Sequence, residues 1–153
     1  MPLTDPVSPP NNARYVFLNP RSKLFFVDWE RAADDIVAML RSEAGRNPYD
    51  KALTDLIGEL STRSETFRAR WAAHNVRFHR TGRKQLHHPV VGHLDLSFEA
   101  MELPGEDLTM LVYVAEPASA SQQALDLLAS WAATLDQEQR ERETSFPPAP
   151  SKT

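Results

Sequence analysis

Two apolar segments separated by a turn constrain the fold of this chain more than any other feature. In residues 92–103, leucine and phenylalanine alternate with polar side chains, and this period of two predicts a strand with one buried and one wet face. Residues 108–116 are apolar on both faces, which is typical of a strand in the middle of a sheet or beneath helices. Residues 104–107 have the composition of a hairpin turn, so the two strands are expected to pair antiparallel.

About four helices are expected to cover this sheet. Apolar residues recur at helical spacing in residues 28–44, 48–61, 64–75 and 120–135. The predicted N-caps are Asp28, Asn47, Thr62 or Ser64, and Ser119. Residues 12–20 form either a short helix or an extended segment, and residues 83–88 supply a third strand. The sequence therefore predicts an α+β fold with an antiparallel sheet of about three strands.

The first, third and fourth of these helices each carry one tryptophan. Large rings at such positions are mostly core packing, but three of them around one sheet also suit the walls of a pocket. Both interpretations stay open for Trp29, Trp71 and Trp131.

The composition is that of one globular domain with loose ends. The chain has 153 residues, and its 41% hydrophobic content suffices for a core. Prolines cluster at both ends. We therefore expect a disordered segment over residues 1–11, a domain over 12–136, and a charged then proline-rich tail over 137–153.

Charge and cysteine content exclude several classes of function. The formal net charge is −4, so the domain is a poor candidate for binding nucleic acid through its own field. The chain has no cysteine, which excludes disulfides and thiolate chemistry. No stretch approaches the roughly 20 apolar residues that span a bilayer, and the start does not resemble a signal peptide. A cytoplasmic protein without a membrane partner is the simplest interpretation.

All five histidines lie within residues 74–93, which raises the question of a metal site. Their spacing does not align them on one helix or strand face, and neither HExxH nor a cysteine partner is present. Ser97 lies near His93 and Asp95, but on a strand these side chains would stand in a row and not around a nucleophile elbow. We therefore expect no metal, no cofactor and no catalytic residue.

Five sequence blocks carry a family resemblance. They are residues 12–20 (NARYVFLNP), 28–30 (DWE), 67–77 (FRARWAAHNVR), 87–92 (HHPVVG) and 113–117 (YVAEP). In this order and spacing they resemble the MmyB-like ligand-binding domain. This domain is the C-terminal sensor half of many bacterial helix-turn-helix regulators of the XRE type, abundant in actinobacteria.

The resemblance implies a PAS-like sheet wrapped by helices, with a hydrophobic pocket for a small apolar ligand of the fatty-acyl class. It implies a non-catalytic sensing domain and a homodimer, which would act on DNA only through a helix-turn-helix that is absent from this chain. Family members also carry upstream strands that are not seen here. A fragment, a truncated reading frame or a stand-alone sensor is therefore expected. The alternative is a protein-interaction module that dimerises with full-length relatives.

The resemblance also implies a set of ligand contacts, with aromatic walls and a cation for a carboxylate. These candidates are Arg14, Phe17, Trp71, His74, Arg77, His88 and Tyr113. Core packing is the simpler explanation for the aromatic members, and a surface strand position explains Arg77 equally well.

Overall fold

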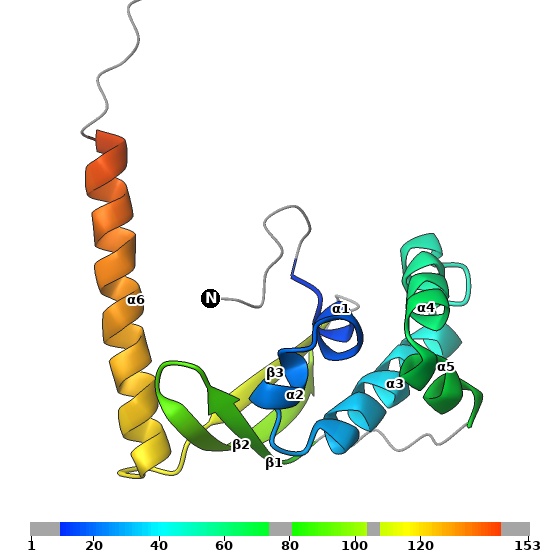
Figure 1. The fold of residues 1–153 in the computed structure, drawn as a ribbon, viewed down its shortest axis with the longest axis horizontal. Helices are drawn as coiled ribbons and strands as arrows, with labels where there is room; N and C mark the ends of the chain where they lie inside the picture. The colour runs from blue at the N-terminus through cyan, green and yellow to red at the C-terminus, as the bar shows by residue number, and fades with distance from the viewer. Residues whose placement is uncertain (1–9, 74–80, 104–107, 145–153) are drawn as a thin grey trace, which may run out of the picture.

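The structure, a computed structural model, describes residues 10–73, 81–103 and 108–144. Within these ranges the chain forms helices and one antiparallel sheet, so the predicted α+β class is confirmed (Figure 1). The elements are α1 (Asn12–Leu18), α2 (Ser22–Phe25), α3 (Trp29–Arg46), α4 (Lys51–Arg63), α5 (Glu65–Ala72), β1 (Thr81–His88), β2 (Gly92–Glu102), β3 (Thr109–Val114) and α6 (Ala120–Thr144).

The three described strands lie in the order β1-β2-β3 with antiparallel neighbours. The predicted pairing of the two apolar segments is confirmed, with Phe98 opposite Tyr113, while the turn at 104–107 lies outside the described residues. Of the two predicted places for the last strand, the middle of the sheet is not observed among the described strands, whereas a position beneath a helix fits Leu111, which lines a cavity with Met39 of α3. Among the described strands β3 is at the edge, and most of its side chains are exposed. Apolar content on both faces therefore does not reflect a central position here.

Several helix boundaries follow from side-chain caps. The Asp28 side chain accepts a hydrogen bond from the Arg31 N–H, and the Ser64 hydroxyl accepts one from the Phe67 N–H, as predicted. Asn47 is not the cap of α4. It ends α3 instead, and the carboxylate of Asp50 caps α4 by accepting from the Leu53 N–H. A carboxylate there also suits the positive end of the helix dipole.

A separate set of caps fixes α5 and α6. Thr62 does not start α5, because its hydroxyl donates to the Gly58 carbonyl inside α4. Ser119 caps α6 by accepting from the Gln122 N–H, as predicted. The charged stretch that follows residue 135 continues as helix to Thr144.

The main core lies among the first five helices. Its fully buried side chains include Val16, Val37, Leu60 and Phe67, one from each of α1, α3, α4 and α5. Phe26 joins this core and bridges to Leu86 of β1, so the segment after α2 lies along one edge of the sheet. The helices are thereby anchored to the sheet through β1.

A smaller core holds the start of α6 against the sheet. Leu94 and Leu96 of β2 pack with Ala124 and Leu125. The Ser121 hydroxyl accepts a hydrogen bond of 2.9 Å from the Asp95 N–H, beyond the point where β3 pairing stops. From this contact α6 rises away from the sheet, on the side opposite to α4 and α5 in the view of Figure 1.

The three tryptophans do not form one pocket. The Trp29 indole donates to the Val16 carbonyl and the Ser22 hydroxyl, and Trp71 packs against the main core. Trp131 lies on α6 and is 45% exposed. Core packing, the other interpretation, is therefore what the structure shows for Trp29 and Trp71.

Candidate functional site

A cleft between α3 and one face of the sheet is the best candidate for a binding site. The closest backbone packing of α3 is against α1, α2, α4 and α5 and not against the strands. Cavities lie between α3 and the sheet near both ends of the helix. We call this space the α3–sheet cleft; it is bounded by Arg31, Asp35, Met39 and Ser42 on α3, and by Lys84, Phe98, Leu111 and Tyr113 on the sheet.

The cleft is charged at its centre. The Lys84 ammonium lies 3.3 Å from the Asp35 carboxylate, and both side chains are largely buried. The same ammonium lies 5.3 Å from the ring centre of Phe98, on the next strand. Burial raises the pKa of the Tyr113 phenol, and the nearby Asp35 carboxylate raises it further. Asp35 therefore pairs with Lys84 of β1 and lies near Tyr113 of β3, and Tyr113 is a neutral hydrogen-bond donor at physiological pH.

The larger cavity, of about 320 Å³, lies where the first turns of α3 pass the edge of β1. Its walls hold three cations and three carboxylates. Lys84 pairs with Asp35, and Arg83 forms two hydrogen bonds of 3.2 and 2.9 Å with Asp95. The Asp28 carboxylate is engaged as the cap of α3.

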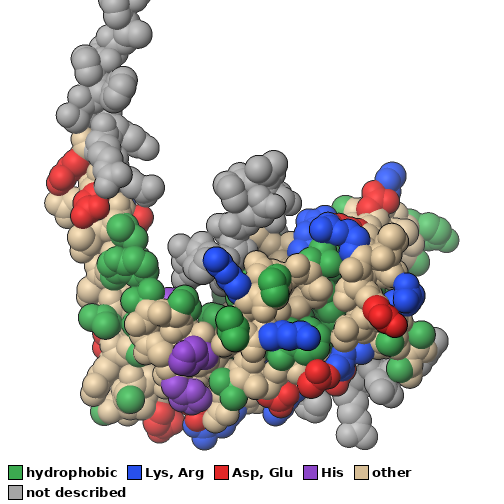
Figure 2. Space-filling model, in the orientation of Figure 1, with side chains coloured by type: hydrophobic (Ala, Val, Ile, Leu, Met, Phe, Trp, Pro, Cys, Tyr) green, Lys and Arg blue, Asp and Glu red, His purple; other side chains and the backbone are tan. Residues whose placement is uncertain are grey.

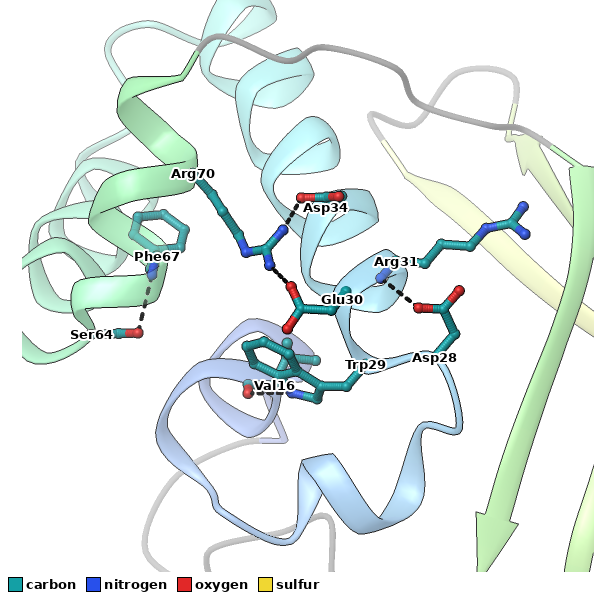
Figure 3. A network of polar contacts seen from close by, with 9 residues as sticks. All are labelled: Val16, Asp28, Trp29, Glu30, Arg31, Asp34, Ser64, Phe67 and Arg70. Atoms are coloured by element: carbon teal, nitrogen blue, oxygen red, sulfur yellow. Dashed lines mark hydrogen bonds and ion pairs between the residues drawn. The ribbon is translucent and has the colours of Figure 1, made fainter.

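The remaining cation of this cavity is Arg31. Its backbone N–H binds the Asp28 cap, and its side chain reaches from α3 toward the strands (Figure 3). In the part of the chain that the structure describes, no carboxylate lies within ion-pair distance of its guanidinium. An accessible guanidinium in a cavity suits an anionic group of a ligand.

The other end of the cleft is apolar and narrow. A cavity of about 60 Å³ is lined by Met39, Ser42, Thr109 and Leu111. The two cavities thus differ in character: Arg31 lines the charged one, and Met39 and Leu111 line the apolar one. An anionic head suits the first and a short apolar chain suits the second.

Gly82 keeps the sheet side of the cleft open. A Cβ atom at this position would lie 2.9 Å from the Phe98 ring and 3.6 Å from the Arg31 guanidinium. Any larger residue would therefore displace the ring or fill the space before the arginine.

Two of the predicted ligand contacts, Phe17 and Trp71, are brought together by the fold, but within the helical core. Both rings pack on the fully buried Phe67, with ring centres 5.0 and 5.5 Å apart. The Arg41 guanidinium covers the outer face of Trp71 at 4.5 Å. Core packing accounts for these positions, and ligand contact by them stays a prediction.

Arg14 is engaged in an ion pair away from the cleft. Its Nε atom donates to the Glu59 carboxylate at 2.9 Å, which links α1 to α4. This hydrogen bond lowers the pKa of the Glu59 carboxyl, and Arg63 adds to the effect. Two other predicted contacts, His74 and Arg77, lie outside the described residues. Tyr113 is thus the predicted residue that the structure brings to the cleft.

His88 is buried at the end of β1, beside Phe25. Its Nδ1 atom accepts a hydrogen bond of 3.2 Å from the Val90 N–H, which shapes the turn to β2. Burial lowers the pKa of the imidazole. Two observations therefore favour the neutral imidazole: its burial, and the hydrogen bond that Nδ1 accepts. A ligand role for His88 stays a prediction.

Protonation of His88 is expected to destabilise the fold. Its pKa in the folded chain is below that of the unfolded chain, so its contribution is complete above about pH 6.5 and declines as the pH falls below that value. Asparagine retains an acceptor for Val90 but does not titrate. Between pH 7.5 and 5.5, H88N should lose about 1 kcal/mol less unfolding free energy than the parent, because the interval ends about one pH unit below the unfolded pKa and linkage allows at most about 1.4 kcal/mol per unit.

Urea unfolding at the two pH values measures this difference. The control is H87N, on the exposed face of the same strand, which should retain the parental pH dependence. Equal pH dependence of the parent and H88N would contradict the role of the buried imidazole.

Sequence reasoning missed most of the cleft. Arg31, Asp35, Met39 and Ser42 lie at intervals of four, four and three along α3, which places them on one stripe beside the apolar one. The sequence analysis made no prediction for this stripe. The signal was available in the alternation of Gly82 and Lys84 opposite Leu96 and Phe98, which puts a cation on the buried face.

Neither a metal cluster nor a membrane span is found in residues 10–73, 81–103 and 108–144. No group of three or more histidine, aspartate or glutamate side chains there is arranged to hold an ion. No helix in those ranges is long and apolar enough to cross a membrane.

The described residues thus form an α+β domain in which α3 is held above the sheet, with cavities between them. The chain matches the family model of the MmyB-like transcription regulator ligand binding domain over residues 2–128. The chain therefore belongs to this family, and the resemblance carried by the five sequence blocks is confirmed. No curated protein matches the chain.

Proposed function

We propose that the chain is a non-catalytic sensing domain of a bacterial XRE-type transcriptional regulator, and that it binds a fatty-acyl or similar amphiphilic anion in the α3–sheet cleft. Membership of a regulator ligand-binding family supports the sensing role. The observation that carries the ligand class is Arg31, a guanidinium without a described ion-pair partner in the charged cavity of a cleft whose other cavity is lined by Met39 and Leu111. Tyr113 supplies a second donor within the cleft.

Binding in this cleft would bias the position of α3 relative to the sheet. α3 carries the buried apolar stripe that holds the helical core, so a ligand beneath it is coupled to that whole body. A ligand shifts such an equilibrium by its difference in affinity for the two positions. In a full-length regulator, this change would alter DNA binding by a helix-turn-helix domain.

Calorimetric titration with decanoate and with 1-decanol tests the proposal. Decanoate should bind with one site per chain, and the alcohol more weakly. The unfolding temperature should rise with the decanoate concentration, since a ligand at 100 times its dissociation constant adds about 2.7 kcal/mol to the unfolding free energy. Absence of both heat and stabilisation for decanoate would contradict the fatty-acyl assignment.

A second candidate function is a dimerisation module that modulates full-length relatives. The exposed apolar side chains of β3, at the sheet edge, favour it.

A further inference from the structure

His87 of β1 and His93 of β2 lie directly opposite each other in the antiparallel ladder. Both side chains are exposed, on the face of the sheet away from Lys84 and Phe98. Figure 2 shows histidine side chains together on the surface over the β1–β2 hairpin. Spacing along the chain predicts no shared face for the histidines on one strand, whereas the pairing register places these two side by side across two strands.

The directions of the backbone hydrogen bonds show that the histidines form a non-hydrogen-bonded pair. The Gln85 carbonyl points out of the β1–β2 ladder and accepts a hydrogen bond of 3.2 Å from the Val27 N–H. Its partner Asp95 also points outward, since its N–H donates to the Ser121 hydroxyl at 2.9 Å. These directions repeat every second residue, so the histidine pair, two residues closer to the turn, has the same character. The Cα atoms of such pairs are only about 4.5 Å apart, and their side chains approach more closely than those of hydrogen-bonded pairs.

Two imidazoles at this separation can bind one metal ion. The Cβ atoms of cross-strand partners are about 4.5–5.5 Å apart, and both rings extend outward from the same face. A slight tilt brings one nitrogen of each ring to the metal–nitrogen distance of about 2.0–2.1 Å. Neutral imidazole is a ligand for Zn²⁺, Cu²⁺ and Ni²⁺, whereas Mg²⁺ and Ca²⁺ take oxygen ligands.

The rings are available for an ion. Among the described residues, the hydrogen bond and ring contact made by a histidine belong to His88, and neither His87 nor His93 has a hydrogen-bond or ion-pair partner. The nearest carboxylate on their face is that of Asp95, and the Arg83 guanidinium engages it through two hydrogen bonds. It therefore does not compete for the imidazoles.

The turn beside the pair holds the two strands in a fixed register. The buried His88 accepts the Val90 N–H through Nδ1. Gly92 has a φ of +77°, a left-handed conformation that glycine adopts without steric cost. The ligands are therefore brought together by the backbone before an ion arrives, which lowers the entropic cost of binding.

We propose that His87 and His93 form a surface site for one divalent transition-metal ion of the imidazole-preferring class, Cu²⁺, Ni²⁺ or Zn²⁺. Water completes the coordination sphere, because no group of three or more histidine, aspartate or glutamate side chains surrounds an ion position within the residues that the structure describes. The bound ion links β1 to β2 beside their turn. The site lies on the face away from Lys84 and Phe98 of the α3–sheet cleft, so its absence would leave the ligand proposal intact.

Titration of the full, untagged chain with Cu²⁺ tests this proposal by calorimetry and electron paramagnetic resonance. Cu²⁺ is the probe because it binds nitrogen sites most tightly among the divalent first-row ions. One equivalent should bind, with a spectrum that shows coupling to two imidazole nitrogens, and Mg²⁺ should not bind. H87Q and H93Q should each weaken Cu²⁺ binding at least about 100-fold, because the second imidazole then no longer acts at a high effective concentration.

The matched control is H74Q/H79Q, which removes two histidines outside the described residues and should bind Cu²⁺ as the parent does. Both ligands are exposed, so H87Q and H93Q should fold as the parent does, and circular dichroism before each titration checks this. Absence of Cu²⁺ binding by the parent, coupling to fewer than two nitrogens, binding that survives H87Q or H93Q, or its loss in H74Q/H79Q would each overturn the proposal.

Discussion

Replacement of Phe67 by alanine is expected to lower the free energy of unfolding by about 3–5 kcal/mol. The ring is fully buried, and it is the point where Phe17 of α1 and Trp71 of α5 meet. Its removal would leave a cavity among rings that cannot collapse onto one another without losing their own contacts. The unfolding temperature should fall by roughly 10 °C for a domain of this size.

Thermal and urea unfolding followed by circular dichroism measure the effect. Y49A is the matched control, because that aromatic side chain is 97% exposed in the loop before α4 and should change stability by less than about 0.5 kcal/mol. A loss below 1 kcal/mol for F67A would show that the helical core is not organised around this ring.

The contrast between these two aromatic residues illustrates what the sequence determines. Phe67 follows Ser64 by three positions, so the cap that begins α5 also sets the ring on the inner face of the helix. Tyr49 fits an apolar stripe equally well when α4 is started at Asn47. It is exposed because the helix begins two residues after it. A one-turn shift of a cap is enough to move a residue from the core to solvent.

The strands were predictable for a related reason. Alternation in β2 depends on Leu94, Leu96 and Phe98, all of which are buried, so period and burial agree. In β3 the apolar pattern and the observed burial do not agree. Its side chains are mostly exposed in the part of the chain that the structure describes. Sequence pattern reports that a strand requires cover but not which molecule provides it.

The site was harder to predict because its residues look ordinary one at a time. The network around the start of α3 illustrates this (Figure 3). Arg70 of α5 pairs with Glu30 and Asp34, which removes those carboxylates from the neighbourhood of Arg31. Arg31 points from α3 toward the strands, whereas Arg70 reaches Glu30 and Asp34 from α5. Sequence spacing alone does not show which arginine pairs with which carboxylate.

The surface of the helical body carries many charged side chains of both signs. Figure 2 shows acidic and basic side chains mixed over the helical body, and green side chains along α6 above its contact with the sheet. Paired surface charges of this kind contribute little to stability, since exposed ion pairs are worth about 0–1 kcal/mol. A cation without such a pair, lining a cavity, is the feature that points to a ligand.

Substitution of Arg31 by glutamine is expected to weaken decanoate binding by about 10–100-fold. This range corresponds to the roughly 1.5–3 kcal/mol of a hydrogen bond to a charged group. Binding of 1-decanol should be unchanged, because the apolar end of the cleft, at Met39 and Leu111, is not altered. Stability should change little, since Arg31 is exposed and its side chain has no described ion-pair partner.

The matched control is R83Q, which removes a cation of the same cavity that Asp95 already engages. It should reduce decanoate affinity by less than about 3-fold, because its guanidinium is not available to the ligand. Calorimetry of the parent and both variants with acid and alcohol gives the required comparison. Equal losses for R31Q and R83Q would indicate attraction by net charge alone. An unchanged affinity in R31Q would place the carboxylate elsewhere and leave Arg77, predicted from the family blocks, as the next residue to replace.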